Sequence, residues 1–203
     1  MFLPRHFAET DPAEIAGLLR RAGFGHLVVA APEGLAATPL PFVVDDELTS
    51  VRAHLARPND VWRLAPCDAL VVVPVSDAYV SPGWYPSKSV DGRVVPTWNY
   101  EVVHLHGRLV VHDDADWVRR QISELTDLNE SAMPAPWEVA DAPDDFIDQL
   151  QRGIVGVELE VTRVEAKRKL SQNKSADDVA GAVAGLRAAS NPRAAVVAAA
   201  MDG

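Results

Sequence analysis

The chain has 203 residues, of which 48% are hydrophobic, and its formal net charge is −10 at pH 7. That much apolar material excludes disorder over most of the chain, and no apolar run reaches the roughly 18 residues that a bilayer-spanning helix needs. Because a nucleic-acid-binding surface needs cations to displace counterions from phosphates, the acidic balance argues against broad DNA binding.

The chain contains a single cysteine, Cys67. This excludes intramolecular disulfides and cysteine-based zinc sites, and a small buried residue is the simplest interpretation of it. The first residues lack the basic start and the long apolar stretch of a signal peptide. We therefore expect a cytoplasmic protein.

The first third of the chain predicts one helix followed by short strands. Asp11 caps the expected helix and Gly23 ends it. Pro39 and Pro41 mark an edge or irregular stretch within the second strand. We expect strands over residues 25–31, 35–44 and 48–55, and a short helix over 59–64.

The rest of the chain predicts three longer strands and several helices. A strongly apolar run suits a buried strand at 69–75, and three prolines and two glycines predict an ordered loop over 79–96. Further strands are expected over 97–112 and 153–164, and helices over 114–129, 144–151, 175–189 and from Asn191 onward.

These elements predict a mainly β (α+β) fold, in which short connections make the strands mostly antiparallel and helices pack on a small barrel. A Rossmann fold is excluded, because the first strand lacks G-x-G-x-x-G and the βαβ rhythm is absent. We expect one domain over residues 1–189, followed by an alanine-rich helical tail over 190–203.

Aromatic residues concentrate in the segments that break the scaffold pattern. Three of the five tryptophans and all three tyrosines lie within residues 54–62, 79–85 and 95–100. Next to Ser, Thr, Asn and Arg, they indicate a pocket for a planar polar ligand. The alternative is that Trp62, Trp84 and Trp98 only cover the ends of the barrel.

Two segments offer cations for an anionic group. His54, Arg57 and Asn59 stand where a strand meets a short helix, a place that suits a phosphate. The alternative is a surface arginine and a hydrogen-bonded strand-end histidine. Lys169 to Lys174 is a second basic segment, which a solvated turn would also explain.

Metal and nucleophile chemistry find less support. His104 and His106 alternate on one expected strand and could join His54 in a three-histidine site, but such histidines are more often exposed or hydrogen-bonded. There is no G-x-S-x-G motif for a nucleophilic serine.

Taken together, these segments resemble the PaiB family of flavin mononucleotide (FMN)-binding split-barrel proteins. The features stand in the family's order over about residues 1–185: Met1-Phe2-x-Pro4-x-x-Phe7, Phe24-Gly25-x-Leu27-Val28, Leu40-Pro41, His54-x-Ala56-Arg57-x-Asn59-x-x-Trp62, Tyr79-x-Ser81-Pro82-x-Trp84-Tyr85, Val95-Pro96-Thr97-Trp98-Asn99-Tyr100 and Lys169-Leu170-Ser171-Gln172-Asn173-Lys174. The loop from Pro86 to Val94 and the tail from Ala189 lie outside these motifs.

The resemblance implies an antiparallel split β-barrel with peripheral helices, a homodimer, and FMN held at the dimer interface. Family members are described as negative regulators of protease and sporulation genes. We therefore expect an FMN-binding protein with a regulatory or redox role. One alternative is an enzyme, either a flavin reductase or a pyridoxamine-phosphate-oxidase-like protein. Another is direct transcriptional repression, which the negative net charge and the missing helix-turn-helix oppose. A further alternative is a haem-linked role of His54, His104 or His106.

Each expected cofactor-binding residue has a role that its chemistry suggests. Cations would hold the phosphate, aromatic rings would wall the flavin, and backbone donors from the Thr38–Phe42 strand would meet the polar edge of the ring. The residues are Thr38, Leu40, Pro41, His54, Arg57, Asn59, Trp62, Trp84, Trp98, Asn99, Tyr100, Lys169, Ser171, Gln172 and Lys174.

Overall fold

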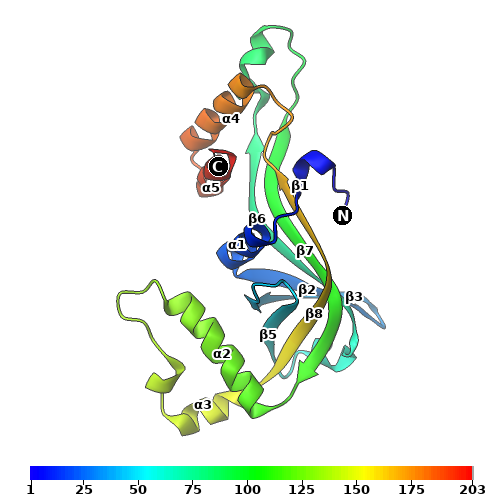
Figure 1. Cartoon of the computed structure of the whole chain (residues 1–203), viewed down its shortest axis with the longest axis vertical. Helices are drawn as coiled ribbons and strands as arrows, with labels where there is room; N and C mark the ends of the chain where they lie inside the picture. The colour runs from blue at the N-terminus through cyan, green and yellow to red at the C-terminus, as the bar shows by residue number, and fades with distance from the viewer. Residues whose placement is uncertain (203) are drawn as a thin grey trace. The chain divides into compact units, whose positions relative to one another are not determined.

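The structure is a computed structural model that describes residues 1–202, and the chain forms two compact units (Figure 1). Unit 1 consists of Met1–Asp11, Pro74–Val103 and the chain from Glu165 onward. Unit 2 consists of Pro12–Val73 and His104–Val164. The units are interleaved in sequence, since three long strands each contribute one part to unit 1 and the other part to unit 2.

The strands form a single antiparallel sheet, which confirms the expected strand arrangement. The sheet order is β3-β2-β6-β7-β8-β5-β4, and β1 pairs with β8. The strands are β1 (Ala8–Glu9), β2 (Phe24–Ala31), β3 (Gly34–Pro41), β4 (Val43–Val44), β5 (Ser50–Ala56), β6 (Cys67–Val80), β7 (Thr97–His112) and β8 (Ile154–Lys169).

Two strands are longer than the sequence predicts. β6 was expected to end at Val75, but it continues to Val80. The polar Ser76 fits within the strand because it is buried and its hydroxyl donates a hydrogen bond to the Glu101 carboxylate of β7. β8 was expected to end at Val164 and continues to Lys169, because its alternation places Ala166 and Leu170 in the core. In the segment Lys169 to Lys174, which a basic turn was an alternative way to explain, the first lysine is the last residue of this strand.

The helices begin and end close to the expected positions. They are α1 (Pro12–Ala22), α2 (Ala115–Glu130), α3 (Asp144–Gln151), α4 (Ala176–Ala188) and α5 (Pro192–Asp202). The short helix expected over 59–64 is the 3-10 helix η2 (Asp60–Leu64), capped by the Asn59 side chain, which accepts from the Val61 N–H at 3.2 Å. Of the helices in residues 1–202, none is both long enough and apolar enough to cross a bilayer.

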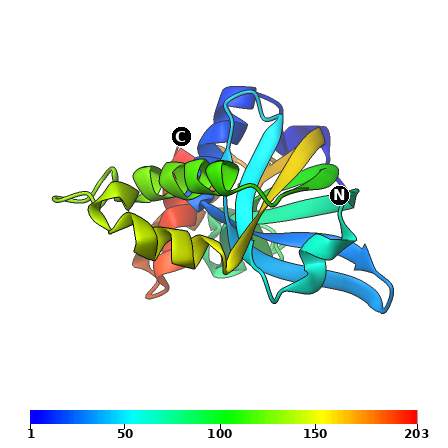
Figure 2. The same ribbon diagram turned by 90° about the horizontal axis from the view of Figure 1, so that it is seen from below.

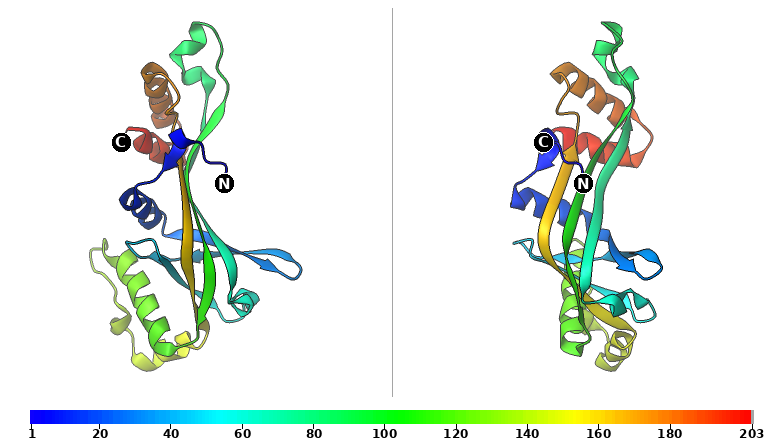
Figure 3. Two further views of the ribbon diagram at one scale, coloured as in Figure 1. Left: turned by 45° about the vertical axis from the view of Figure 1, so that its right-hand side comes forward. Right: turned by 90° about the vertical axis from the view of Figure 1, so that its right-hand side faces the viewer.

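In unit 2, α1 and α2 pack against the strands, and α2 and α3 lie side by side (Figure 2). β2 and β3 form the blue hairpin of Figure 3, whose inward side chains, such as Leu27, Val29 and Leu40, are buried. α1 ends where predicted, because Gly23 takes a φ of 58° and donates its N–H to the Leu19 carbonyl at 2.9 Å.

In unit 1, α4 and α5 pack against each other and against β6 (Figure 1). Ala194, Val197 and Ala198 of α5 share a hydrophobic core with Leu186 of α4 and Val80 of β6, and all five are buried. The alanine-rich tail is therefore a packed part of unit 1. Small side chains serve this purpose, because they let the two helices approach closely.

A buried ion pair joins the strands of unit 1. Glu101 of β7 is 2% exposed, accepts from the Ser76 hydroxyl at 2.9 Å, and accepts from Arg168 Nε of β8 at 3.0 Å. Arg168 also reaches Glu9 of β1 at 3.5 Å. A buried carboxylate is stable only when it is paired and hydrogen-bonded, so this pair fixes the register of β6, β7 and β8 within the unit.

Replacement of Gly107 by alanine is expected to destabilise the protein by about 1–3 kcal/mol, the usual cost of overpacking. A Cβ at this position of β7 would overlap the Glu160 carbonyl oxygen of β8, and a backbone atom cannot swing away. Chemical denaturation provides the measurement. The matched control is Gly17→Ala in α1, where the nearest atom is 3.8 Å from the new Cβ; this helix substitution should stabilise by about 0.5–1 kcal/mol. Equal effects of the two changes would contradict the packing described.

Candidate functional site

The predicted cofactor-binding residues fall into two groups, one on each unit. The first group lies on β3, β5 and η2 of unit 2, and the second lies on β7, on β8 and in the loops of unit 1. The unit 2 group contains Thr38, Leu40, Pro41, His54, Arg57, Asn59 and Trp62. The unit 1 group contains Trp84, Trp98, Asn99, Tyr100, Lys169, Ser171, Gln172 and Lys174.

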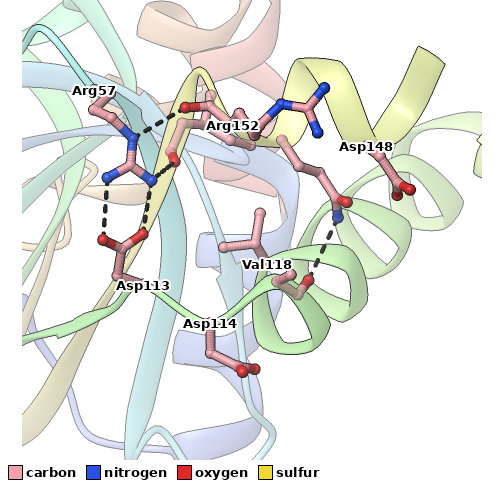
Figure 4. A pocket seen from close by; sticks show the side chains of 9 residues that line it. Arg57, Asp113, Asp114, Val118, Asp148 and Arg152 are labelled. Atoms are coloured by element: carbon pink, nitrogen blue, oxygen red, sulfur yellow. Dashed lines mark hydrogen bonds and ion pairs between the residues drawn. The ribbon is translucent and has the colours of Figure 1, made fainter. Parts of the chain in front are cut away.

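The Arg57 guanidinium follows the end of β5 and is held in a fixed orientation (Figure 4). Its Nε donates to the Arg152 carbonyl at 3.0 Å and its Nη2 donates to the Ile154 carbonyl at 2.9 Å. The outer face of the fork binds Asp113, with Nη1–Oδ2 and Nη2–Oδ1 distances of 3.1 and 2.6 Å. The hydrogen bonds from Arg57 lower the pKa of Asp113. The fork is therefore oriented for an oxyanion, and an aspartate of the chain occupies it.

Arg57 and Asp113 line a cavity of about 380 Å³ beside the N-terminus of α2 and the C-terminus of α3. Asp114 accepts from the Trp117 N–H at 2.8 Å and so caps α2. The full lining is Arg57, Asp113, Asp114, Ala115, Val118, Asp148, Gln151, Arg152 and Ile154. Sequence reasoning found Arg57 but missed Asp113, because only the tertiary structure brings the end of β7 beside the end of β5.

Trp62 lies beside Arg57 within unit 2. Its indole Nε1 donates to the Arg57 carbonyl at 3.0 Å, and its ring centroid lies 6.0 Å from the Arg57 guanidinium carbon. Asn59 donates to the Thr38 hydroxyl at 3.2 Å, which ties η2 to β3. The contacts form two pairs, Arg57 with Trp62 and Asn59 with Thr38, and η2 carries or adjoins a member of each.

His54 faces away from these two pairs. Its Nδ1 lies 2.8 Å from Oε1 of the buried Gln121 on α2, so it serves to anchor that helix to β5. Among residues 1–202, it does not share a group of potential metal ligands with His104 and His106, whose ring centroids are 6.3 Å apart. The three-histidine alternative is not supported by this arrangement.

The β3 backbone offers few donors to a ligand. The Phe42 N–H bonds to the Gly23 carbonyl at 3.2 Å, and the β2–β3 register then directs the N–H groups of Leu40 and Thr38 toward β2 as well. The outward positions between them are Pro39 and Pro41, which have no N–H. The N–H groups of Thr38, Leu40 and Phe42 are therefore directed away from a ligand at the outer edge of β3.

Three polar residues predicted to bind the cofactor have internal partners in unit 1. Asn99 is fully buried and donates to the Ser171 hydroxyl at 2.9 Å. Ser171 has a positive φ of 67° and is 4% exposed. Gln172 accepts from the Leu170 N–H at 2.8 Å and donates to the Arg168 carbonyl at 2.6 Å, so it shapes the turn after β8. These contacts account for all three residues as parts of the scaffold.

Trp84 packs on α4. A Cβ at Gly185 would overlap atoms of the Trp84 ring, and one at Gly181 would overlap the Trp84 carbonyl oxygen. The two glycines therefore allow the loop and the helix to approach closely. Trp84 thus covers the unit 1 core, as the alternative interpretation of the tryptophans expects.

Trp98 and Tyr100 project from β7 beside the lysines of β8. Trp98 is 53% exposed and meets the Tyr79 ring edge-on, at a centroid distance of 6.3 Å. Lys169 Nζ donates to the Thr97 hydroxyl at 2.6 Å and to the Trp98 carbonyl. Burial lowers the pKa of Lys169, and the charges of Lys167 and Lys174 lower it further. Lys167 was missed in the sequence, where it stands two residues before Lys169, the spacing that shares one strand face.

A family model described as "Putative FMN-binding domain" matches residues 1–163. The chain belongs to this family. The match covers all of unit 2 except its last residue, Val164, together with the parts of unit 1 that precede Glu165, and it confirms the expected relationship and the expected cofactor, FMN.

Two curated relatives extend the comparison. The Bacillus subtilis protease synthase and sporulation protein PAI 2 is 29% identical over 200 residues, covering 96% of this chain and 93% of that protein. An uncharacterized protein of Aspergillus fumigatus is 36% identical over 123 residues, covering 53% of this chain and 47% of that protein. The chain therefore matches less than half the length of this fungal relative.

Solved structures share the fold at low identity. The FAD and heme binding protein from Mycobacterium smegmatis matches with a TM-score of 0.60 and 16% identity, covering 86% of this chain and 79% of that one. The similarity confirms a fold of the flavin-binding split-barrel type.

Gly185→Ala is expected to destabilise the protein by about 1–3 kcal/mol and to leave its affinity for FMN unchanged, because the displaced Trp84 ring belongs to the α4 contact. Thermal unfolding and flavin titration give the two readouts. A loss of FMN affinity without a loss of stability would indicate that Trp84 contacts the flavin.

Proposed function

We propose that this chain binds FMN through Arg57 and neighbouring residues of unit 2 and uses the flavin in a redox reaction, or as a redox signal to a regulatory partner. The family match supports the cofactor. The name of the Bacillus subtilis relative, which refers to protease synthesis and sporulation, supports the regulatory alternative. A flavin reductase or oxidase of the pyridoxamine-phosphate type is the enzymatic version of the same proposal.

The observation that carries the proposal is the occupied fork of Arg57. Asp113 binds it through two parallel N–H···O contacts, the geometry with which arginine also binds phosphate. The Asp113 side chain is 55% exposed and stands in the short connection between β7 and α2, so it can move aside. The FMN phosphate carries more negative charge than a carboxylate and offers three oxygens, so it would replace Asp113 on the fork.

The neighbouring residues fit the remaining parts of FMN. Trp62 offers an aromatic surface whose position is fixed by its hydrogen bond to the Arg57 carbonyl. The Thr38 hydroxyl and the Asn59 amide offer polar atoms next to it. FMN supplies one- and two-electron transfer when it is bound, while the protein binds and orients it. The work of this chain is to hold the phosphate at Arg57 and to keep Trp62 in place.

A regulatory role would act through a partner or a ligand. Acidic residues outnumber basic ones by 29 to 19, which opposes contact with DNA phosphates. Direct repression by the isolated protein is therefore the less favoured version of the regulatory proposal.

Arg57→Ala is expected to weaken FMN binding by about tenfold to hundredfold, the range for losing hydrogen bonds to a charged group. Arg57→Lys should recover only part of the affinity, because an ammonium cannot form two parallel hydrogen bonds. Titration followed by flavin fluorescence gives the dissociation constants, and riboflavin, which lacks the phosphate, is the matched ligand. Riboflavin should bind all three proteins about equally.

Asp113→Asn tests the same fork from the other side. Removing the competing carboxylate should strengthen FMN binding by about twofold to fivefold, since exposed ion pairs are weak. Unchanged FMN affinity in all the Arg57 and Asp113 variants would place the phosphate elsewhere.

We also propose that the protein is a homodimer. The support is the family resemblance together with the large apolar side chains that unit 1 leaves exposed, among them Phe2 at 84% and Val95 at 69%. Sedimentation at micromolar concentration should give twice the chain mass of 21.9 kDa. A monomer at that concentration would remove the dimer from the proposal.

A further inference from the structure

All four lysines of this acidic protein lie in unit 1, and three of them stand at the end of β8 or just after it. Lys167 and Lys169 project from one face of β8 toward Tyr100 of β7, with Nζ-to-ring distances of 5.3 and 6.0 Å. Lys174 follows the turn after β8, and its charge acts on Lys169. We call Lys167, Lys169, Lys174, Tyr100 and Trp98 the lysine face.

Two lysines of the lysine face, Lys167 and Lys169, bond to neutral groups, whereas Lys174 interacts electrostatically with Asp178 of α4. Lys167 is 8% exposed and donates to the Phe2 carbonyl at 3.1 Å, and Lys169 donates to a hydroxyl and a carbonyl. In the part of the chain that the structure describes, neither of these two ammonium groups forms an ion pair with a carboxylate. Buried charges are usually paired, because desolvation is costly. An anion from outside the chain would supply the missing partner.

The cations stand among aromatic rings. Tyr100 lies against two lysines, Trp98 is 53% exposed beside it, and Tyr79 meets Trp98 edge-on. An exposed indole beside ammonium groups suits a ligand that is both flat and negatively charged. The lowered pKa of Lys169, caused by burial and by its two lysine neighbours, agrees with a site that gains stability when an anion binds.

We propose that the lysine face is a binding site for a planar aromatic anion other than FMN. The inference rests on the proposed function in one respect. FMN has a single phosphate, and the proposed function assigns it to Arg57, so the lysines are left for a different anion. The chemistry of the two places also differs. Arg57 presents a fixed two-point fork, whereas the lysines present separate point charges beside rings, which suit a carboxylate or phosphate attached to a flat ring.

The test is calorimetric titration of the full-length protein, with and without added FMN, using 2-naphthoate as the probe. Neutral 2-naphthamide has the same ring system without the negative charge, so it tests whether the charge of the ligand is needed. Inorganic phosphate has the charge without the ring, so it tests whether the aromatic ring of the ligand is needed. We expect 2-naphthoate to bind at least about tenfold more tightly than either control, since it alone offers both features. Equal affinities for 2-naphthoate and 2-naphthamide would overturn the proposal.

Lys169→Gln and Lys174→Gln should each weaken 2-naphthoate binding by about tenfold while FMN affinity stays unchanged. The matched control is Lys88→Gln, which removes the fourth lysine, an exposed residue of the 3-10 helix η4 (Pro86–Ser89). It should change neither affinity, and thermal unfolding confirms that the variants fold.

The outcomes separate this inference from the proposed function. If Lys169→Gln loses FMN together with 2-naphthoate, the lysine face belongs to the FMN site and the inference is wrong. If the Arg57 variants keep full FMN affinity while the lysine variants lose only 2-naphthoate, the lysine face stands and the phosphate assignment fails.

Discussion

The buried carboxylate of Glu101 is the constraint on which unit 1 depends. It needs a cation, and Arg168 of the neighbouring strand supplies one at 3.0 Å. Side chains alternate between the two faces of a strand. Since Glu101 and Arg168 lie on one face of the sheet, their neighbours in sequence, Tyr100 on β7 and Lys167 and Lys169 on β8, lie on the opposite face. One ion pair in the core thereby sets which residues can meet a ligand. Shifting either strand by one residue would turn its member of the Glu101–Arg168 pair to the opposite face of the sheet and break the pair.

Unit 2 uses an arginine in a similar way, but at a strand end. Arg57 donates to the carbonyls of Arg152 and Ile154 and so holds the start of β8 beside the end of β5. The remaining donors of its fork face Asp113. The same side chain thus stabilises the fold with two hydrogen bonds and presents two more for an oxyanion. A ligand that takes the place of Asp113 need not reorganise the arginine, which limits the entropy cost of binding.

Many residues of the recognised motifs serve the scaffold rather than a ligand. Asn99, Ser171 and Gln172 bond to one another or to nearby backbone, and Trp84 fills the space that Gly181 and Gly185 leave on α4. A motif therefore marks residues that must stay together for the fold as well as residues that touch a cofactor. Only the hydrogen-bond partners distinguish the two cases. Trp98, which is 53% exposed, and Arg57, whose fork faces the exposed Asp113, remain the stronger ligand candidates.

The sequence by itself determined the antiparallel β fold, nearly all helix boundaries and the family, because caps, prolines and alternating apolar residues act over a few neighbouring positions. It also identified Arg57, Lys169 and Lys174 as the cations available for a phosphate. It did not reveal that Asp113 occupies the Arg57 fork, that His54 turns to Gln121, or that β6 and β8 run on to Val80 and Lys169. Those features depend on partners distant in sequence, as Ser76 and Arg168 do on Glu101. Only the tertiary structure decides which distant groups satisfy a buried charge or an open hydrogen bond.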